Sequence, residues 1–169
     1  MLNALQSYNP SAEIPEADRI YDWLIGSWNV EVIDYLENGE VKHVEGEWHF
    51  GRILEGRAIQ DVFICPSRPL RDQNTSKVRN RYGTSIRVFH PGKKRWEVTW
   101  LNPVTGAHDR LVARKEGDKI IQEGKDDEGY QMRWIFTDIR PDSARWYGER
   151  SKDGGASWTL EAEFFLTRP

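Results

Sequence analysis

About ten short segments of the sequence alternate between apolar and polar residues, and turn-rich connections separate them. A period of two places successive side chains on opposite faces of a β-strand. The later connections are short: PGKK, PVTGA, KEGD, KDDEG, RPDSA and SKDGGAS. Parallel neighbours would need crossovers of about a dozen residues or more, so these lengths predict antiparallel strands joined in chain order.

The expected strands cover residues 28–35, 41–54, 57–64, 82–90, 95–102, 108–114, 119–124, 131–139, 145–150 and 158–168. Asn38-Gly39, between the first two, is a strong hairpin signal. With no helix between them, these strands predict an all-β fold, a single up-and-down antiparallel β-barrel, because closure removes unpaired edges. An open sandwich is the alternative architecture.

The N-terminal residues differ from the rest of the chain. Residues 1–14 show little periodicity and are expected to form a flexible arm. Residues 15–25 predict a short helix, because Pro15 suits a first helical position and three apolar residues share one face. Gly26 would end that helix. The barrel domain is therefore expected to span residues 15–169.

Composition excludes several classes of protein. The chain has 27 acidic and 24 basic residues, a net charge of −3, which disfavours nucleic acid as a partner. No segment approaches the roughly 18 apolar residues of a membrane span, and the N-terminus lacks the apolar run of a secretory signal. A single cysteine, Cys65, allows no internal disulfide, which predicts a cytoplasmic protein. The lack of a long apolar segment predicts no membrane contact.

Tryptophans are the candidate wall of a binding cavity. The chain has eight, of which Trp28 is expected to close the barrel beside the helix and Trp158 to anchor a hairpin. Five others fall on the more apolar phase of the strands or at the ends of them: Trp48, Trp96, Trp100, Trp134 and Trp146. They predict a cavity for a flat or elongated small molecule, apolar or aromatic.

Two arginines could give this ligand an anionic partner group. Arg87 and Arg150 both lie on a candidate inward phase, where either could bind a carboxylate or phenolate. The phase around Arg87 stays open, because a buried arginine needs a carboxylate or an anionic ligand. If Arg87 points outward, Ile86 and Val88 are buried instead. If Ile86 and Val88 are exposed, they could join two copies in a homodimer.

The connection from residue 65 to residue 81 is long for a barrel. It holds the five basic residues Arg68, Arg71, Lys77, Arg79 and Arg81 against the single acid Asp72, a net charge of +4. Such a loop could steer an anionic ligand to the barrel mouth, and a solvated flexible loop is the alternative.

Other candidate chemistry is sparse. The row His43, Glu45, Glu47 and His49 shares one strand face, but its ends lie about 20 Å apart, so the row is expected to be a solvated face and not a metal site. Cys65 has no histidine nearby in sequence to act as a base. No cofactor motif is present, and we expect no resident cofactor.

An enzyme on the same scaffold is the alternative to a binding protein. Asp61, Glu123 and Glu149 could act as acid or base if they face inward with an arginine, as in a lyase, cyclase or hydratase. This alternative is an analogy from fold.

Residues 151–158, SKDGGASW, resemble the Asp-box, a pattern that forms a tight hairpin. Asp-boxes recur in sialidase propellers, where they come in several copies away from the catalytic centre. We therefore expect a structural role for this single copy.

Several runs together resemble a known group. They are WLIGSW at 23–28, LEGR at 54–57, QDV at 60–62, YGTSIRVFHP at 82–91 and WEVTW at 96–100. The chain resembles uncharacterised bacterial proteins of the DUF1579 type, which are similar to the calycins, the group of lipocalins and fatty-acid-binding proteins. The resemblance covers about residues 20–168 and implies a lipocalin-like barrel with an internal cavity. It brings no catalytic residues. Nitrobindin-like calycins bind haem through a late histidine, whereas no histidine here lies beyond His108.

Overall fold

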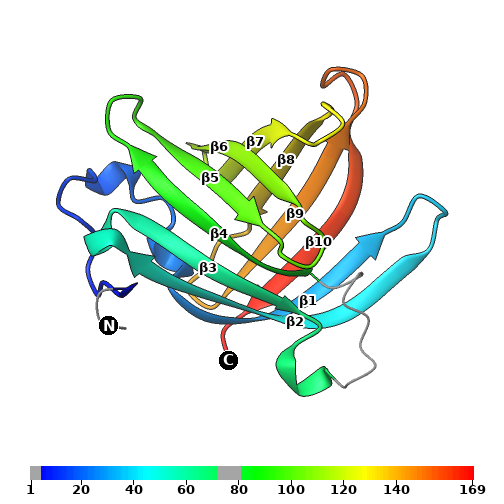
Figure 1. Cartoon of the computed structure of the whole chain (residues 1–169), viewed down its shortest axis with the longest axis horizontal. Coiled ribbons are helices and arrows are strands. Elements are labelled where there is room, and N and C mark those ends of the chain that lie inside the picture. The colour runs from blue at the N-terminus through cyan, green and yellow to red at the C-terminus, as the bar shows by residue number, and fades with distance from the viewer. Residues whose placement is uncertain (1–4, 72–80) are drawn as a thin grey trace.

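Ten antiparallel strands close into a barrel in the computed structural model, which describes residues 5–71 and 81–169 (Figure 1). Each strand pairs with its neighbours in the sequence, and the first strand pairs with the last to close the ring. The predicted all-β, up-and-down barrel is confirmed, and the open sandwich is excluded.

The strands are β1 (Gly26–Tyr35), β2 (Val41–Ile53), β3 (Ala58–Cys65), β4 (Arg81–His90), β5 (Arg95–Leu101), β6 (His108–Glu116), β7 (Lys119–Lys125), β8 (Gln131–Thr137), β9 (Ser143–Ser151) and β10 (Thr159–Thr167). Short 3-10 turns accompany them, among them η2 (Glu16–Asp18), η3 (Asp22–Leu24), η4 (Leu54–Gly56) and η5 (Arg68–Leu70).

The prediction of a helix over residues 15–25 is wrong, because this segment contains only the two 3-10 turns η2 and η3. The backbone leaves helical geometry at Arg19, where ψ is 50°. Tertiary contacts outweigh the local pattern: Tyr21 and Leu24 are fully buried, and the Trp96 indole Nε1 donates to the Asp18 carbonyl at 2.7 Å. The buried residues also differ from the predicted apolar face, since Tyr21 is fully buried whereas Ile20 and Trp23 are half-buried.

The segment before β1 lies across one end of the barrel (blue in Figure 1). The Ser7 amide donates to the Arg52 carbonyl at 2.9 Å, and Ile14 is buried. Residues 1–4 of the predicted arm lie outside the described residues. At the other end of the chain, the Arg168 guanidinium stacks 3.6 Å from the Trp28 ring centre and donates to the Trp23 carbonyl at 2.7 Å. Arg168 thus joins the residue after β10 to the start of β1 and to the segment before it.

Strand pairing sets which side chains face inward. Trp28 pairs with Trp48, and Trp48 pairs with Phe63, so this inner phase passes from β1 to β3. Arg87 of β4 pairs with the buried Val98 of β5, and it is only 1% exposed. Arg87 therefore points inward, which settles the phase that the sequence left open.

Ile86 and Val88 consequently lie on the outer face of β4. Val88 is exposed, as are Val62 of β3 and Tyr82 at the start of β4. The homodimer through this face stays a prediction.

The segment Ser151–Trp158 forms the expected tight turn. Asp153 Oδ1 accepts from the Ser157 amide, and Ser151 Oγ accepts from the Gly155 amide, at 2.8 and 2.7 Å. Hydrogen bonds, the Ser157 hydroxyl foremost, lower the pKa of Asp153 to about 2. The Arg133 guanidinium stacks 3.9 Å from the Trp158 ring centre. All these contacts stay within the hairpin and its neighbouring strand β8.

Among the described residues, no helix is long and apolar enough to cross a membrane.

Candidate ligand-binding cavity

The inner faces of the strands enclose a cavity of about 260 Å³. Its wall is mainly aromatic, formed by Trp48, Phe63, Trp100, Trp134, Trp146 and Phe164. The rings are in contact with one another: Trp146 stacks on Phe164 at 4.1 Å between ring centres, and Phe164 stacks on Phe63 at 5.1 Å. Stacked rings hold each other in place, so the wall offers a rigid surface to a flat ligand.

Two glycines make room for the indoles. A Cβ atom at Gly148 would lie 2.9 Å from Trp146, and one at Gly83 would lie 2.6 Å from Trp100. Both indoles therefore lie against bare backbone, because any side chain at these glycines would collide with them. The sequence contains these glycines within strands, which is a signal of close approach.

Arg87, which lines the cavity, belongs to a buried ion pair. Arg87 Nη1 donates to Asp61 Oδ2 at 2.5 Å, and Asp61 Oδ1 accepts from the Ser85 amide at 2.8 Å. The guanidinium carbon of Arg87 lies 5.3 Å from the ring centre of Tyr21 and 5.4 Å from that of Phe50. The partner that an inward Arg87 needs is therefore Asp61, from the neighbouring strand β3.

Tyr21 extends this polar layer toward the closed end of the barrel. Its hydroxyl donates to Gln122 Oε1 at 3.0 Å, and both residues are fully buried. Burial raises the pKa of Tyr21 well above its ordinary value. Tyr21 therefore stays a neutral hydrogen-bond donor.

Five of the seven residues predicted for the site line this cavity: Trp48, Arg87, Trp100, Trp134 and Trp146. The other two lie elsewhere. Trp96 is at the closed end, edge-on to Tyr21 with ring centres 5.3 Å apart. Arg150 lies at the mouth, where its Nε is 2.6 Å from Asp126 Oδ2. Both follow the inward phase as predicted, but they sit at different heights in the barrel.

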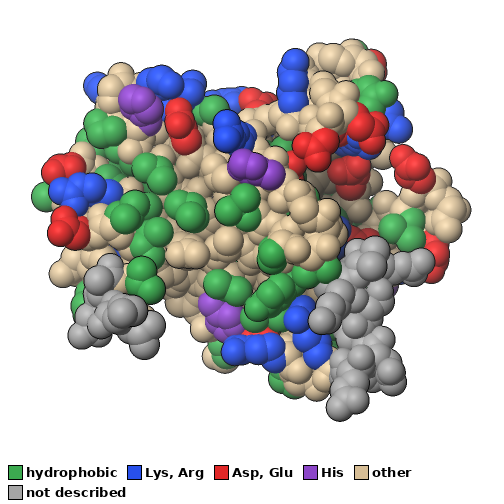
Figure 2. Space-filling view, viewed as in Figure 1, with side chains coloured by type: hydrophobic (Ala, Val, Ile, Leu, Met, Phe, Trp, Pro, Cys, Tyr) green, Lys and Arg blue, Asp and Glu red, His purple; other side chains and the backbone are tan. Residues whose placement is uncertain are grey.

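The cavity reaches the surface through a wide groove of about 1480 Å³ beside the hairpin of β1 and β2. Arg81, Asn102 and Glu161 line both spaces. Figure 2 shows the hollow, with acidic side chains gathered around it. A ligand therefore has an open route at one end, while the segment before β1 covers the other.

Two carboxyl groups near this mouth escaped the sequence analysis. Asp109 lines the cavity because it follows the inward phase of β6, opposite Trp100. Simple alternation with Leu160 and Ala162 would leave Glu161 on the outer face, but a β-bulge between these two residues turns it to the cavity. Loss of solvation raises the pKa of both groups, and the charges of Asp127 and Asp126 raise that of Asp109 further.

The acid–base candidates do not meet in the cavity. Glu123 pairs with Arg114, and Glu149 pairs with Arg133, each at 2.5 Å. Both glutamates lie on the outer phase of their strands, so their proposed inward role is wrong. Asp61 does face inward, but both of its oxygens already accept hydrogen bonds.

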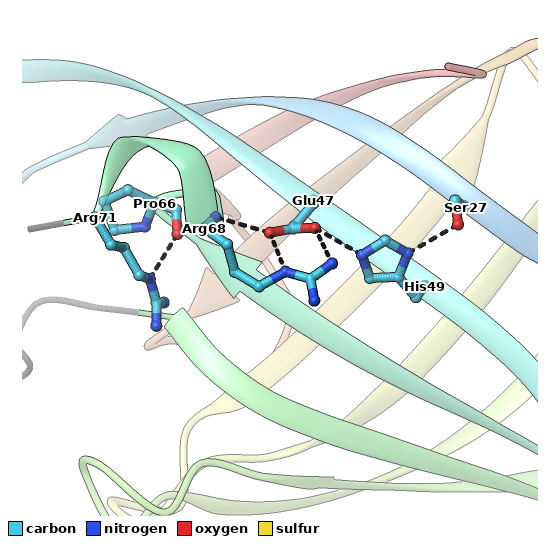
Figure 3. A network of polar contacts seen from close by, with 6 residues as sticks. All are labelled: Ser27, Glu47, His49, Pro66, Arg68 and Arg71. Carbon is cyan, nitrogen blue, oxygen red and sulfur yellow. Dashed lines mark hydrogen bonds and ion pairs between the residues drawn. The ribbon is translucent and has the colours of Figure 1, made fainter.

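The row His43, Glu45, Glu47 and His49 lies on the outer face of β2, where His43 and Glu45 are exposed and Glu47 and His49 are half-buried. Figure 3 shows Glu47 held by Arg68, with His49 between Glu47 and Ser27. His49 Nε2 lies 2.8 Å from Glu47 Oε2, and His49 Nδ1 lies 2.9 Å from Ser27 Oγ. His43 instead faces Glu31 at 3.5 Å. No group of three or more metal-ligating side chains occurs in the described residues.

Arg68 fastens the start of the long connection to the outside of the barrel. Its backbone amide and its guanidinium all donate to Glu47, at 2.7 to 2.9 Å. These bonds, with the Arg68 side chain foremost, lower the pKa of Glu47 to about 2.

Two other basic residues of the connection are also engaged. Arg71 donates to the Pro66 carbonyl at 2.8 Å, and Arg81 pairs with Asp34. The predicted steering charge is therefore reduced within the described residues; Lys77, Arg79 and Asp72 lie outside them.

Cys65 lies at the end of β3 and is buried. Burial raises the pKa of its thiol to about 11. The thiol is protonated at neutral pH, which fits the expected absence of a catalytic role.

The comparisons with known proteins support the fold. No protein-family model matches the sequence, and no curated protein matches it, so the DUF1579 resemblance receives no family assignment. Solved structures do match. The S-type phycobiliprotein lyase CPES from Guillardia theta has a TM-score of 0.58 and 11% identity over 93% of this chain and 94% of its own. Rv2717c from M. tuberculosis has a TM-score of 0.58 and 14% identity over 92% and 99%.

The closed ten-stranded barrel is therefore a fold that this chain shares with both proteins. At these identities the likeness extends to the fold alone. What the barrel does has to be inferred from its own cavity.

The ion pair in the cavity wall predicts a large loss of stability when one partner is removed. Asp61→Asn should lower the free energy of unfolding by about 3–5 kcal/mol, because Arg87 keeps its charge in a buried site. Urea denaturation followed by tryptophan fluorescence measures this loss. The double variant Asp61→Leu/Arg87→Met should be more stable than Asp61→Asn. If the unfolding free energy of Asp61→Asn lies within about 0.5 kcal/mol of the wild-type value, then water and not Asp61 stabilises Arg87.

The low pKa of Glu47 predicts acid sensitivity. The folded protein favours the carboxylate, so its stabilisation is present above the ordinary pKa of 4.5 and is lost as the pH falls toward 2. Unfolding free energies measured across this window should fall less steeply in Glu47→Gln than in the wild type. Glu45→Gln, on the same strand face, is the control. Equal slopes in all three proteins would contradict the role of Arg68.

Proposed function

We propose that this protein binds a small aromatic molecule inside the barrel. One observation carries the proposal: four tryptophans, Trp48, Trp100, Trp134 and Trp146, wall a single cavity that opens to the surface at one end. Ligand pockets in proteins are typically apolar and aromatic with a few placed polar groups, and this cavity has that composition. Its volume of about 260 Å³ suits a compact ligand.

The paired arginines favour a neutral ligand over a strongly anionic one. Asp61 compensates the charge of Arg87, and Asp126 and Glu128 flank Arg150. An anion would have to compete with these carboxylates. The anionic variant of the sequence-based proposal therefore has less support than the apolar aromatic one.

The structural relatives add little to the choice of ligand. CPES is by name a phycobiliprotein lyase, and its likeness to this chain is one of fold. Membership of the DUF1579 group is likewise a proposal, which rests on the sequence runs and not on a matched family model.

Titration with neutral polycyclic aromatics should quench tryptophan fluorescence with one-site saturation. Ala162 lines the cavity and is buried, so Ala162→Leu should fill part of it and weaken binding by at least about tenfold. Phe165→Leu, on the exposed side of the same strand, is the matched control and should leave the affinity unchanged. Thermal melts confirm that both variants fold. The proposal fails if aromatics, fatty acids and tetrapyrroles give no saturable change.

An enzyme remains the second candidate function, and the observation that favours it is the pair of carboxyl groups near the mouth. Asp109 and Glu161 line the cavity, and burial raises the pKa of each, as an acid catalyst requires. A ligand that is converted after binding should lose turnover in Asp109→Asn or Glu161→Gln while its affinity is retained. Equal turnover in the wild type and both variants would remove this candidate.

A further inference from the structure

Two N–H groups in the cavity wall have no acceptor. Within the described part of the chain, neither Trp48 Nε1 nor Arg87 Nε has a hydrogen-bond partner. Both residues line the cavity, with only 5% and 1% of their surfaces exposed. Buried donors are almost always hydrogen-bonded in folded proteins, so two unpaired donors in one cavity wall need an explanation.

The two donors belong to neighbouring groups. The Phe50 ring packs against both residues, 4.9 Å from the Trp48 ring centre and 5.4 Å from the Arg87 guanidinium carbon. A third buried donor, Gln122 Nε2, also has no partner among the described residues, and Gln122 Oε1 already accepts from Tyr21. The inner end of the barrel therefore has more donors than acceptors.

The acceptors at this end are already engaged. Asp61 Oδ1 accepts from the Ser85 amide, and Asp61 Oδ2 accepts from Arg87. A ligand that brought a donor to this end would add to the surplus. A ligand that brought an acceptor would give the unpaired N–H groups a hydrogen-bond partner.

Charge decides which kind of acceptor fits. Asp61 neutralises Arg87, and farther out the cavity is lined by the acids Asp109 and Glu161. A second anion at the inner end would meet no uncompensated positive charge there. An oxygen without formal charge meets the donors at no such cost.

We propose that the aromatic ligand carries a neutral hydrogen-bond acceptor, such as a ketone or lactam oxygen, at the end that enters the cavity first. This inference rests on the proposed function and specifies the chemistry of its ligand. Trp48 and Arg87 bind the oxygen, and the aromatic wall binds the rings.

Three probes with one ring skeleton test the inference: fluorenone, fluorene and fluorene-9-carboxylate. Isothermal titration calorimetry should give fluorenone a Kd about tenfold lower than that of fluorene, because one well-placed hydrogen bond accounts for a difference of this order. Fluorene-9-carboxylate should bind more weakly than fluorenone. Infrared spectra should place the carbonyl stretch of bound fluorenone below its frequency in cyclohexane, and this readout needs no variant.

Trp48→Phe removes the indole N–H and keeps an aromatic ring. It should reduce the preference for fluorenone over fluorene at least threefold. Trp134→Phe is the matched control: it also shortens an indole of the wall, so it should weaken both probes and leave their ratio unchanged.

The outcomes separate the two proposals. If fluorene and fluorenone bind equally and the carbonyl stretch is unshifted, an aromatic cavity stands and the acceptor inference is overturned. If the carboxylate binds most tightly, the preferred acceptor is anionic and the inference is again overturned. If no probe binds, both proposals lose their support.

Discussion

The buried pair of Arg87 and Asp61 is the interaction on which the interior of this barrel depends. Two charges inside an apolar barrel are tolerated only because each compensates the other and the remaining carboxylate oxygen accepts a backbone N–H. The pair lies between a filled part of the interior and an empty one. On one side Tyr21 packs edge to face with Trp96 and Phe136, and on the other side lies the cavity.

The strands could be predicted from the sequence because their signal is local. A period of two, glycine-rich turns and short connections leave few arrangements other than a meander, and closure follows from the need to pair the edge strands. The segment before β1 could not be predicted in the same way. Its conformation depends on where Tyr21 and Leu24 are buried, which is set by strands far away in the sequence.

The site was predicted less completely than the fold, for reasons that particular residues show. Alternation assigns a face to a residue but not a height along the barrel, so Trp96 and Trp100 looked equivalent although only Trp100 lines the cavity. A bulge shifts the phase within β10, so simple alternation does not find Glu161 among the residues that line the cavity. Arg87 was ambiguous because its partner Asp61 lies 26 positions away on another strand.

The pairing of β1 with β10 brings residues such as Val30 and Leu166 together from opposite ends of the sequence. Every other strand pair joins neighbours in the chain, so the eight ladders from β1–β2 to β8–β9 can form before β10 is synthesised. Until β10 pairs with β1, one edge of β1 is unpaired, and the stacking contact between Arg168 and Trp28 has not formed. The last of the ten strands in chain order is thus the one that converts an open sheet with an unpaired edge into a closed barrel with an interior.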